Sequence, residues 1–249
     1  MTELDPGARR IEPGRIIGEV FRIYREQAAV LLPVAVVLFA IDAVVTYVLK
    51  DGALAFIASL VTLVAATFYQ GMVVQLVRDV IDGRRDNSIG DLLRSVSPVV
   101  LTLIVVSILA AIATGIGFIL LIVPGLFLLT IWSVIAPVVV VEQPGVFASF
   151  GRSRALVKGH GWQVFGVIVL VFGLLLVVAV LTAILISAVG DVGGAVIGWA
   201  LNVVTAPISA LVAAVLYFAL RVIHGEPARP EDAVQWMPPG ALPGGPGLA

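Results

Sequence analysis

Long apolar runs alternate with short polar segments along most of the chain. A helix needs roughly 20 apolar residues to cross the hydrocarbon core of a bilayer, and runs of about that length recur between residues 28 and 220. We therefore predict an all-α integral membrane protein with six transmembrane helices. Their expected ranges are residues 28–49, 53–77, 97–121, 126–141, 162–187 and 193–220.

The third and fourth predicted helices come from one uncharged run, residues 97–141. This run is too long for a single span, and the sequence "IVPG" (Ile122 to Gly125) interrupts it near the middle. Proline removes a backbone donor and glycine permits a tight reversal, so we expect two helices joined by a very short turn. Other prolines within the apolar runs are expected to mark helix starts or kinks, namely Pro33, Pro98, Pro137 and Pro207.

Amphipathic segments with a helical period precede the odd-numbered spans. Residues 15–26 place Ile16, Ile17, Val20, Phe21 and Tyr24 on one face and Arg15, Glu19, Arg22 and Glu26 on the other. Residues 88–96 repeat the plan, with Ser88 and Asp91 as a capping box. Residues 146–160 form a third, less clearly sided copy. The repetition predicts three related hairpins, each preceded by an amphipathic helix in the membrane interface.

The two ends of the chain differ from the region between them. Residues 1–14 form a polar N-terminal segment, residues 15–224 hold the six-helix domain, and residues 225–249 are rich in proline and glycine. A tail of that composition cannot bury enough surface to order itself, so we predict that it is disordered. The first 27 residues lack the apolar core and cleavage site of a secretory signal peptide.

Composition excludes a soluble globular protein. Hydrophobic residues make up 60% of the chain and charged residues 12%, whereas roughly a quarter of the residues in soluble domains are charged. The chain has no cysteine, which excludes disulfides, thiolate catalysis and cysteine-ligated metals. We expect no cofactor, and the lipid bilayer rather than a nucleic acid is the expected partner.

The basic residues predict the orientation. All but one of the 15 Lys and Arg residues fall before span one, between spans two and three, between spans four and five, or after span six, and Lys50 alone falls on the other side. Since positive charge concentrates on the cytoplasmic side, we predict a multi-pass protein of the bacterial cytoplasmic (inner) membrane with both termini cytoplasmic.

The segment "DVIDGRRDNSIGD", residues 79–91, is the one place where an enzymatic site can be considered. CDP-alcohol phosphotransferases carry D-x2-D-G-x2-A-R-x8-G-x3-D-x3-D, and Asp79, Asp82 and Gly83 fit its opening. Asp86 and Asn87 stand where Ala-Arg is required, and the later glycine and aspartates are missing. Metal sites with oxygen ligands need several convergent carboxylates. We therefore interpret the segment as a solvated loop and predict that the protein is not an enzyme.

His160 offers a second, weaker catalytic interpretation, because it lies near Ser149 and Ser153 in sequence. No glycine-flanked nucleophile turn surrounds either serine. We interpret His160 as a polar anchor at the membrane interface, beside Trp162.

Asp42 is the most informative single residue, because it lies inside the first span. It precedes Lys50 by eight residues, which places it about 12 Å below the outer boundary at 1.5 Å per residue. An ionisable residue at that depth is a candidate proton, cation or substrate site. The alternative is a structural role, with Asp42 protonated or hydrogen-bonded to a hydroxyl such as Thr62, Thr114 or Thr182. The candidate intramembrane polar site comprises Asp42, Tyr69, Gln70, Asn202 and Thr205. Nearby, the small-x-x-x-small sequence "GAVIG", residues 194–198, is typical of close helix packing.

The stretch from Gly117 to Leu170 carries a recognisable set of features. They are the Pro124–Gly125 break, Trp132, Ala136–Pro137, the valine run to Glu142, Ser153, Leu156 and "VKGHGW". The set resembles the membrane domain attached to some bacterial glycerophosphoryl diester phosphodiesterases and found in stand-alone six-helix inner-membrane proteins. The resemblance implies membership and no activity, since the phosphodiesterase chemistry belongs to a separate soluble domain.

Three classes of function follow from these patterns. The first is a non-enzymatic membrane protein that organises or accompanies lipid or envelope factors, with anionic lipid headgroups and a membrane protein as partners. The second is a small transporter or lipid-translocating protein that uses Asp42. The third is a membrane-surface, metal-dependent phospholipid enzyme that uses Asp79, Asp82 and Asp86.

Overall fold

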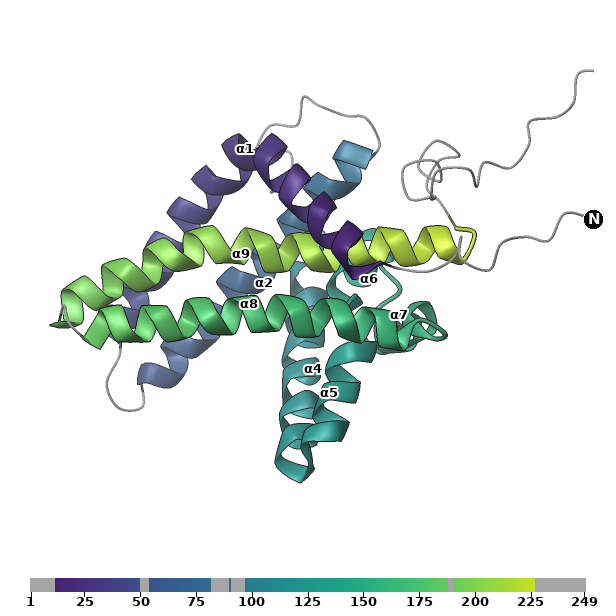
Figure 1. Cartoon of the computed structure of the whole chain (residues 1–249). Helices are drawn as coiled ribbons and strands as arrows, with labels where there is room; N and C mark the ends of the chain where they lie inside the picture. The colour runs from purple at the N-terminus through teal and green to yellow at the C-terminus, as the bar shows by residue number, and fades with distance from the viewer. Residues whose placement is uncertain (1–11, 50–53, 82–89, 91–96, 188–189, 227–249) are drawn as a thin grey trace, which may run out of the picture.

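The computed structural model describes residues 12–49, 54–81, 90, 97–187 and 190–226, and all the secondary structure in these ranges is helical (Figure 1). The long helices are α1 (Pro13–Val48), α2 (Leu54–Ile81), α4 (Val100–Leu120), α8 (Gly161–Ser187) and α9 (Gly190–Ile223). The shorter ones are α5 (Ile122–Ile131), α6 (Ile135–Glu142), α7 (Val146–Val157) and a 3-10 turn at Ser97–Val99. Within the described residues, six stretches are long and apolar enough to cross a membrane, which is the number predicted from the sequence. They are Pro13–Val48, Leu54–Ile81, Val100–Leu120, Ile122–Glu142, Gly161–Leu185 and Val192–Ile223.

Helix α1 joins the first amphipathic segment and the first span into one continuous helix. Figure 1 shows it bent near its middle, and Pro33, which cannot donate a backbone hydrogen bond, lies within it. On the amphipathic part, Ile16, Val20 and Ile23 are buried, whereas Phe21 is exposed to the surroundings. On the charged face, Arg22 donates hydrogen bonds to two glutamates. Its Nε lies 2.9 Å from Oε2 of Glu19, and its Nη1 lies 3.1 Å from Oε1 of Glu26.

Helix α9 forms the centre of the molecule. It contacts α1, α2, α6, α7 and α8, and its most extensive contact is with α1, so the first and last helices pack together. Residues 210–220 are buried without interruption. The contacts with α1, α2, α6, α7 and α8 account for this complete burial.

Helices α4 and α5 form a tight hairpin at the predicted break. Leu121 between them is extended, with φ −164° and ψ 149°. The predicted start of span four at residue 126 is too late, because α5 already begins at Ile122. Pro124 and Gly125 lie in the first turn of α5, where proline is tolerated because the first N–H groups of a helix have no partner. The span is also interrupted at residues 132–134, so that α5 and α6 together form the stretch predicted as one helix.

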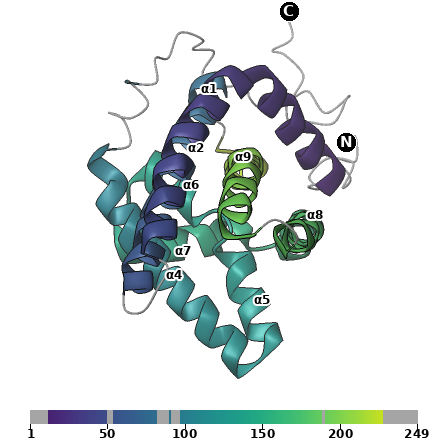
Figure 2. The same ribbon diagram turned by 90° about the vertical axis from the view of Figure 1, so that its left-hand side faces the viewer.

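The α4–α5 hairpin runs steeply across α8 and α9 in Figure 1, and Figure 2, which looks along α8 and α9, shows it projecting away from them. The predicted arrangement of three related hairpins is therefore not confirmed. The residues at its tip, including Ile119 and Val123, are among the most exposed large apolar side chains. The hairpin contacts α2, α6, α7 and α8 through the rest of its length, whereas its tip is exposed.

The third predicted amphipathic segment forms α7, which begins and ends close to its expected limits. Its inner face carries Ser149, Ser153 and Leu156, and Arg154 and Phe147 face outward. The second predicted segment, residues 88–96, lies outside the described residues except for Gly90. The location of these helices in a membrane interface stays a prediction.

Candidate functional sites

The C-terminal half of α1 and the N-terminal halves of α2 and α9 line an open cavity of about 470 Å³, which we call the Asp42 cavity. On α1 the cavity is lined between Phe39 and Tyr47, and on α9 between Gly194 and Asn202. The lining residues are Phe39, Asp42, Ala43, Thr46, Tyr47, Thr62, Gly194, Ala195, Gly198, Trp199 and Asn202. The cavity therefore combines a carboxylate, two threonine hydroxyls and an amide with the three aromatic side chains of Phe39, Tyr47 and Trp199.

Asp42 is only 8% exposed. Its Oδ1 accepts a 2.8 Å hydrogen bond from the hydroxyl of Thr62, which is also 3.1 Å from the carbonyl of Ala58 and 3.5 Å from the hydroxyl of Thr46. The sequence had suggested Thr62 as one of three residues whose hydroxyl could hydrogen-bond Asp42. Thr182, another of them, instead donates to the carbonyl of Val178 in its own helix.

Two aromatic walls of the cavity are fixed by contacts within the protein. The indole N–H of Trp199 donates to the carbonyl of Val36 at 3.3 Å, which ties α9 to α1. The ring of Phe39 packs against Tyr69, with ring centroids 5.5 Å apart. The cavity wall is therefore held in place by partners outside the cavity.

The structure brings together only part of the predicted polar site. Asp42 and Asn202 line the same cavity, and Nδ2 of Asn202 donates to the carbonyl of Gly198 at 3.2 Å. Tyr69, Gln70 and Thr205 do not line it. Tyr69 is buried and donates to the carbonyl of Leu31 at 3.1 Å, and Thr205 donates to Leu201 in its own helix.

Sequence reasoning missed Thr46 and Trp199 as cavity residues. Thr46 follows Asp42 by one helical turn, and Trp199 precedes Asn202 by three residues, so helical periodicity was the available signal. The expected close packing at "GAVIG" is not seen at its last glycine, since a β-carbon added to Gly198 would meet no atom within 4 Å. This glycine faces open space.

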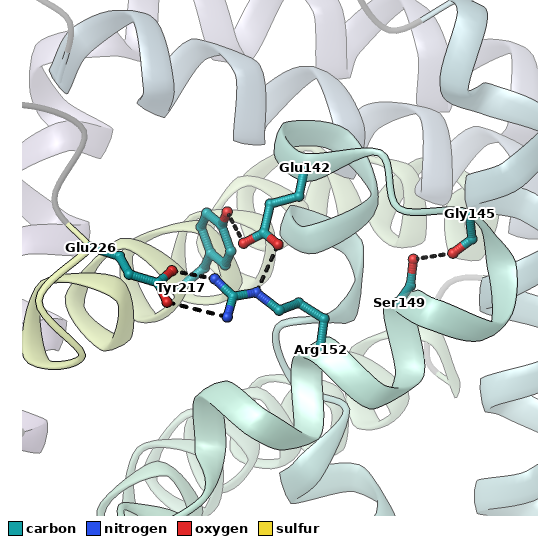
Figure 3. Close-up of polar contacts among 6 residues, drawn as sticks. All are labelled: Glu142, Gly145, Ser149, Arg152, Tyr217 and Glu226. Atoms are coloured by element: carbon teal, nitrogen blue, oxygen red, sulfur yellow. Dashed lines mark hydrogen bonds and ion pairs between the residues drawn. The ribbon is translucent and has the colours of Figure 1, made fainter.

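A second polar cluster joins α6, α7 and the end of α9, and Figure 3 shows its members. Arg152 Nε donates to Oε2 of Glu142 at 2.7 Å, and its terminal nitrogens form an ion pair with Glu226. The hydroxyl of Tyr217 donates to the other oxygen of Glu142 at 2.9 Å. We call these four residues the Arg152 clasp.

The charges within the clasp stabilise one another. The hydrogen bond from Arg152 lowers the pKa of Glu226 below its usual value, and the bond to Glu142 raises the pKa of Arg152. The guanidinium of Arg152, the carboxylates of Glu142 and Glu226 and the hydroxyl of Tyr217 are each bonded to another member of the cluster. The clasp is therefore a connection between helices, with no group poised to act on a substrate.

The serine–histidine arrangement considered for α7 does not form. The Ser149 hydroxyl donates to the carbonyl of Gly145 at 2.7 Å, and Ser153 donates to the carbonyl of Ile131 at 2.8 Å. His160 lies instead against His224, with ring centroids 5.8 Å apart, and its Nδ1 is buried without a hydrogen-bond partner. Trp162, beside which His160 was expected to act as an interfacial anchor, is exposed.

Most of the acidic segment considered for metal binding, including Asp82 and Asp86, lies outside the described residues. Asp79 lies within them and is buried. No group of three or more His, Asp or Glu side chains that could hold a metal ion occurs in the part of the chain that the structure describes.

Comparison of the chain with protein-family models, with curated proteins and with solved structures finds no match.

Proposed function

We propose that the chain is a non-enzymatic multi-pass membrane protein that binds a small molecule or lipid in the Asp42 cavity and transports or translocates it. One observation carries the proposal, namely that a buried ionisable side chain lines a cavity of about 470 Å³. A tightly packed bundle around Asp42 would instead have favoured a purely structural residue.

The size and lining of the cavity suit such a ligand. Small-molecule sites commonly measure about 300–1,000 Å³ and combine apolar walls with a few polar groups. The Asp42 cavity falls in this range and has that composition. The location of the site in the C-terminal half of α1 and the N-terminal half of α9, within predicted spans, suits a ligand that enters from the bilayer or from its outer surface.

The other predicted classes have no comparable support. The organising role, the inner-membrane location with cytoplasmic termini, and the relationship to the phosphodiesterase-linked membrane domain stay proposals from sequence. For the enzymatic class, Asp79 is buried, and Asp82 and Asp86 lie outside the described residues.

The proposal is tested by filling the cavity without disturbing the packing. Gly198→Leu projects a side chain into open space on the cavity wall, and Gly173→Leu, on α8, does the same at a position away from the cavity. Native mass spectrometry of protein released from nanodiscs made with bacterial lipid extract should show one bound lipid or small molecule in wild type and in Gly173→Leu. The same species should be lost in Gly198→Leu. Equal retention in both variants, or only heterogeneous bulk lipid in wild type, would refute the proposal.

A further inference from the structure

We infer that the Asp42 cavity selects an amphiphile with a positively charged ammonium headgroup. This inference rests on the proposed function and names the class of ligand. It follows from three features of the site, which are the missing counter-charge of Asp42, the aromatic lining, and an apolar groove that continues from the cavity.

The first feature is the charge. Within the described residues, Thr62 is the hydrogen-bond donor to Asp42 and no Lys, Arg or His forms an ion pair with it. Lys50 lies outside the described residues, eight positions further along the chain. A carboxylate offers about four lone-pair sites and is costly to bury without a cation. A ligand that brings its own positive charge would supply the missing partner.

The second feature selects the kind of cation. Small metal ions such as Mg²⁺ or Ca²⁺ require about six oxygen ligands, and this cavity offers one carboxylate. The amide nitrogen of Asn202 is turned to the carbonyl of Gly198. Phe39, Tyr47 and Trp199 supply rings instead, and aromatic rings with a carboxylate are the usual recognition site for organic ammonium groups.

The third feature selects an amphiphile. A groove of about 280 Å³ adjoins the cavity and shares Ala43, Tyr47, Ala195 and Trp199 with it. Its remaining walls are apolar, formed by Ala40, Val44, Val192 and Val196. Val44, Val192 and Val196 are exposed on the outside of α1 and α9, which are predicted to face lipid. An ammonium group at Asp42 could therefore continue into an alkyl chain lying in this groove.

Small residues keep the route between the two spaces open. Ala43 and Ala195 stand on either side of it, and Gly198 faces open space. The geometry suits either an aminophospholipid or a free alkylammonium ion, because both combine an ammonium group with an alkyl chain. The experiment separates these two sources.

The first arm changes the ligand and leaves the protein intact. Wild-type protein is placed in nanodiscs of phosphatidylglycerol that contain either phosphatidylethanolamine or its N-acetylated form, which has the same acyl chains and no ammonium charge. Native mass spectrometry should show one retained phosphatidylethanolamine and at least tenfold less of the N-acetylated lipid. A second titration, with dodecyltrimethylammonium in phosphatidylglycerol nanodiscs, tests the free amphiphile.

The second arm changes the protein. Asp42→Asn removes the charge and should reduce retention of the ammonium amphiphile about tenfold or more, whereas Asp42→Glu keeps a carboxylate and should retain it. Gly173→Leu serves as the control away from the cavity, and Gly198→Leu should abolish retention. Because the lipid comparison uses wild-type protein, the inference remains testable even if Asp42→Asn fails to fold.

The outcomes are distinguishable. Retention of phosphatidylethanolamine supports a lipid source, and retention of dodecyltrimethylammonium alone supports a free amphiphile. Retention of the N-acetylated lipid or of phosphatidylglycerol, lost in Gly198→Leu, overturns the inference and leaves the proposed function in place. If wild type retains no specific ligand under any of these conditions, both are overturned.

Discussion

At the scale of single residues, buried hydroxyls satisfy backbone groups where helices end. Helix α5 ends at Ile131, so the carbonyl of this residue is not used by a continuing helix. The buried hydroxyl of Ser153 on α7 donates to it at 2.8 Å. Ser153 thus connects α7 to the point where the fourth span is interrupted.

This contact predicts a measurable loss of stability. Ser153→Ala leaves the Ile131 carbonyl without the donor that the buried Ser153 hydroxyl supplies, and an unsatisfied buried group costs roughly 1–3 kcal/mol. Ser209→Ala is a matched control, because Ser209 is exposed and bonds within its own helix at 3.0 Å. Thermal unfolding in detergent should show a lower midpoint for Ser153→Ala than for the control. Equal midpoints would mean that another group or water replaces the serine.

The Arg152 clasp predicts a pH dependence. The pKa of Glu226 is lowered from 4.5 by Arg152, so its contribution to stability is complete above pH 4.5 and is lost as the pH falls through the lowered value. Because Glu226 is 41% exposed, water screens the pair, and we expect a contribution below about 1 kcal/mol. The difference in unfolding midpoint between wild type and Glu226→Gln should be constant from pH 7 to pH 5 and disappear in stronger acid. A difference that grows on acidification would contradict this assignment.

Residue chemistry could be predicted from the sequence only where it depends on close neighbours. Asp42 stood out as a charged residue in an apolar run, and Thr62 was among its expected partners. Trp199 did not stand out, because a tryptophan in a span is ordinary and its contact with Val36 joins helices more than 150 positions apart. Convergence of that kind depends on tertiary packing, which helical periodicity does not encode.

At the scale of elements, glycines determine how closely α4 and α5 approach. A β-carbon on Gly125 would lie 2.5 Å from the ring of Phe118, and one on Gly117 would lie 3.1 Å from the Cα of Gly125. Contacts that short force the helices apart or displace the ring. The hairpin therefore depends on two small residues that face each other.

Gly125→Ala should consequently destabilise the hairpin, by about 1–3 kcal/mol for an overpacked contact. Gly115→Ala on α4 is the control, since a β-carbon there meets nothing within 4 Å and alanine favours the helix. Thermal unfolding in detergent should place the two variants on opposite sides of wild type. A neutral Gly125→Ala would show that Phe118 moves aside without cost.

The elements themselves were largely predictable, and their limits were less so. The Pro124–Gly125 pair correctly indicated a break in the uncharged run. Its position was wrong by a few residues, because the first turn of a helix accepts proline and α5 could begin before it. The interruption at residues 132–134 has no proline or glycine within it, but it lies just before Pro137, which was expected to mark a helix start or kink and which lies in the first turn of α6.

At the scale of the whole molecule, the number of apolar stretches agrees with the six spans predicted from the sequence. The direction of the α4–α5 hairpin relative to the other helices could not be predicted in this way. Hydrophobicity determines that a segment prefers lipid. The angle between hairpins depends on packing partners, and the α4–α5 tip has none among the described residues. Its direction in a bilayer is therefore open to a direct test.

Cysteine labelling can test both topology and hairpin direction, because the chain contains no cysteine. If all six stretches cross the membrane, an impermeant maleimide added to intact spheroplasts should label Lys50→Cys and should not label Arg154→Cys until the membrane is permeabilised.

Leu121→Cys, at the exposed tip between α4 and α5, tests whether the α4–α5 hairpin crosses the bilayer. A hairpin that crosses the bilayer presents this residue on the same side as residue 50, so we expect it to be labelled from outside. A hairpin that lies within one leaflet keeps the tip in hydrocarbon, and the cysteine would then resist the reagent before and after permeabilisation. That result would reduce the number of crossing helices to four while leaving residues 50 and 154 on opposite sides, because a hairpin that enters and leaves by the same face does not alter the orientation of the spans around it.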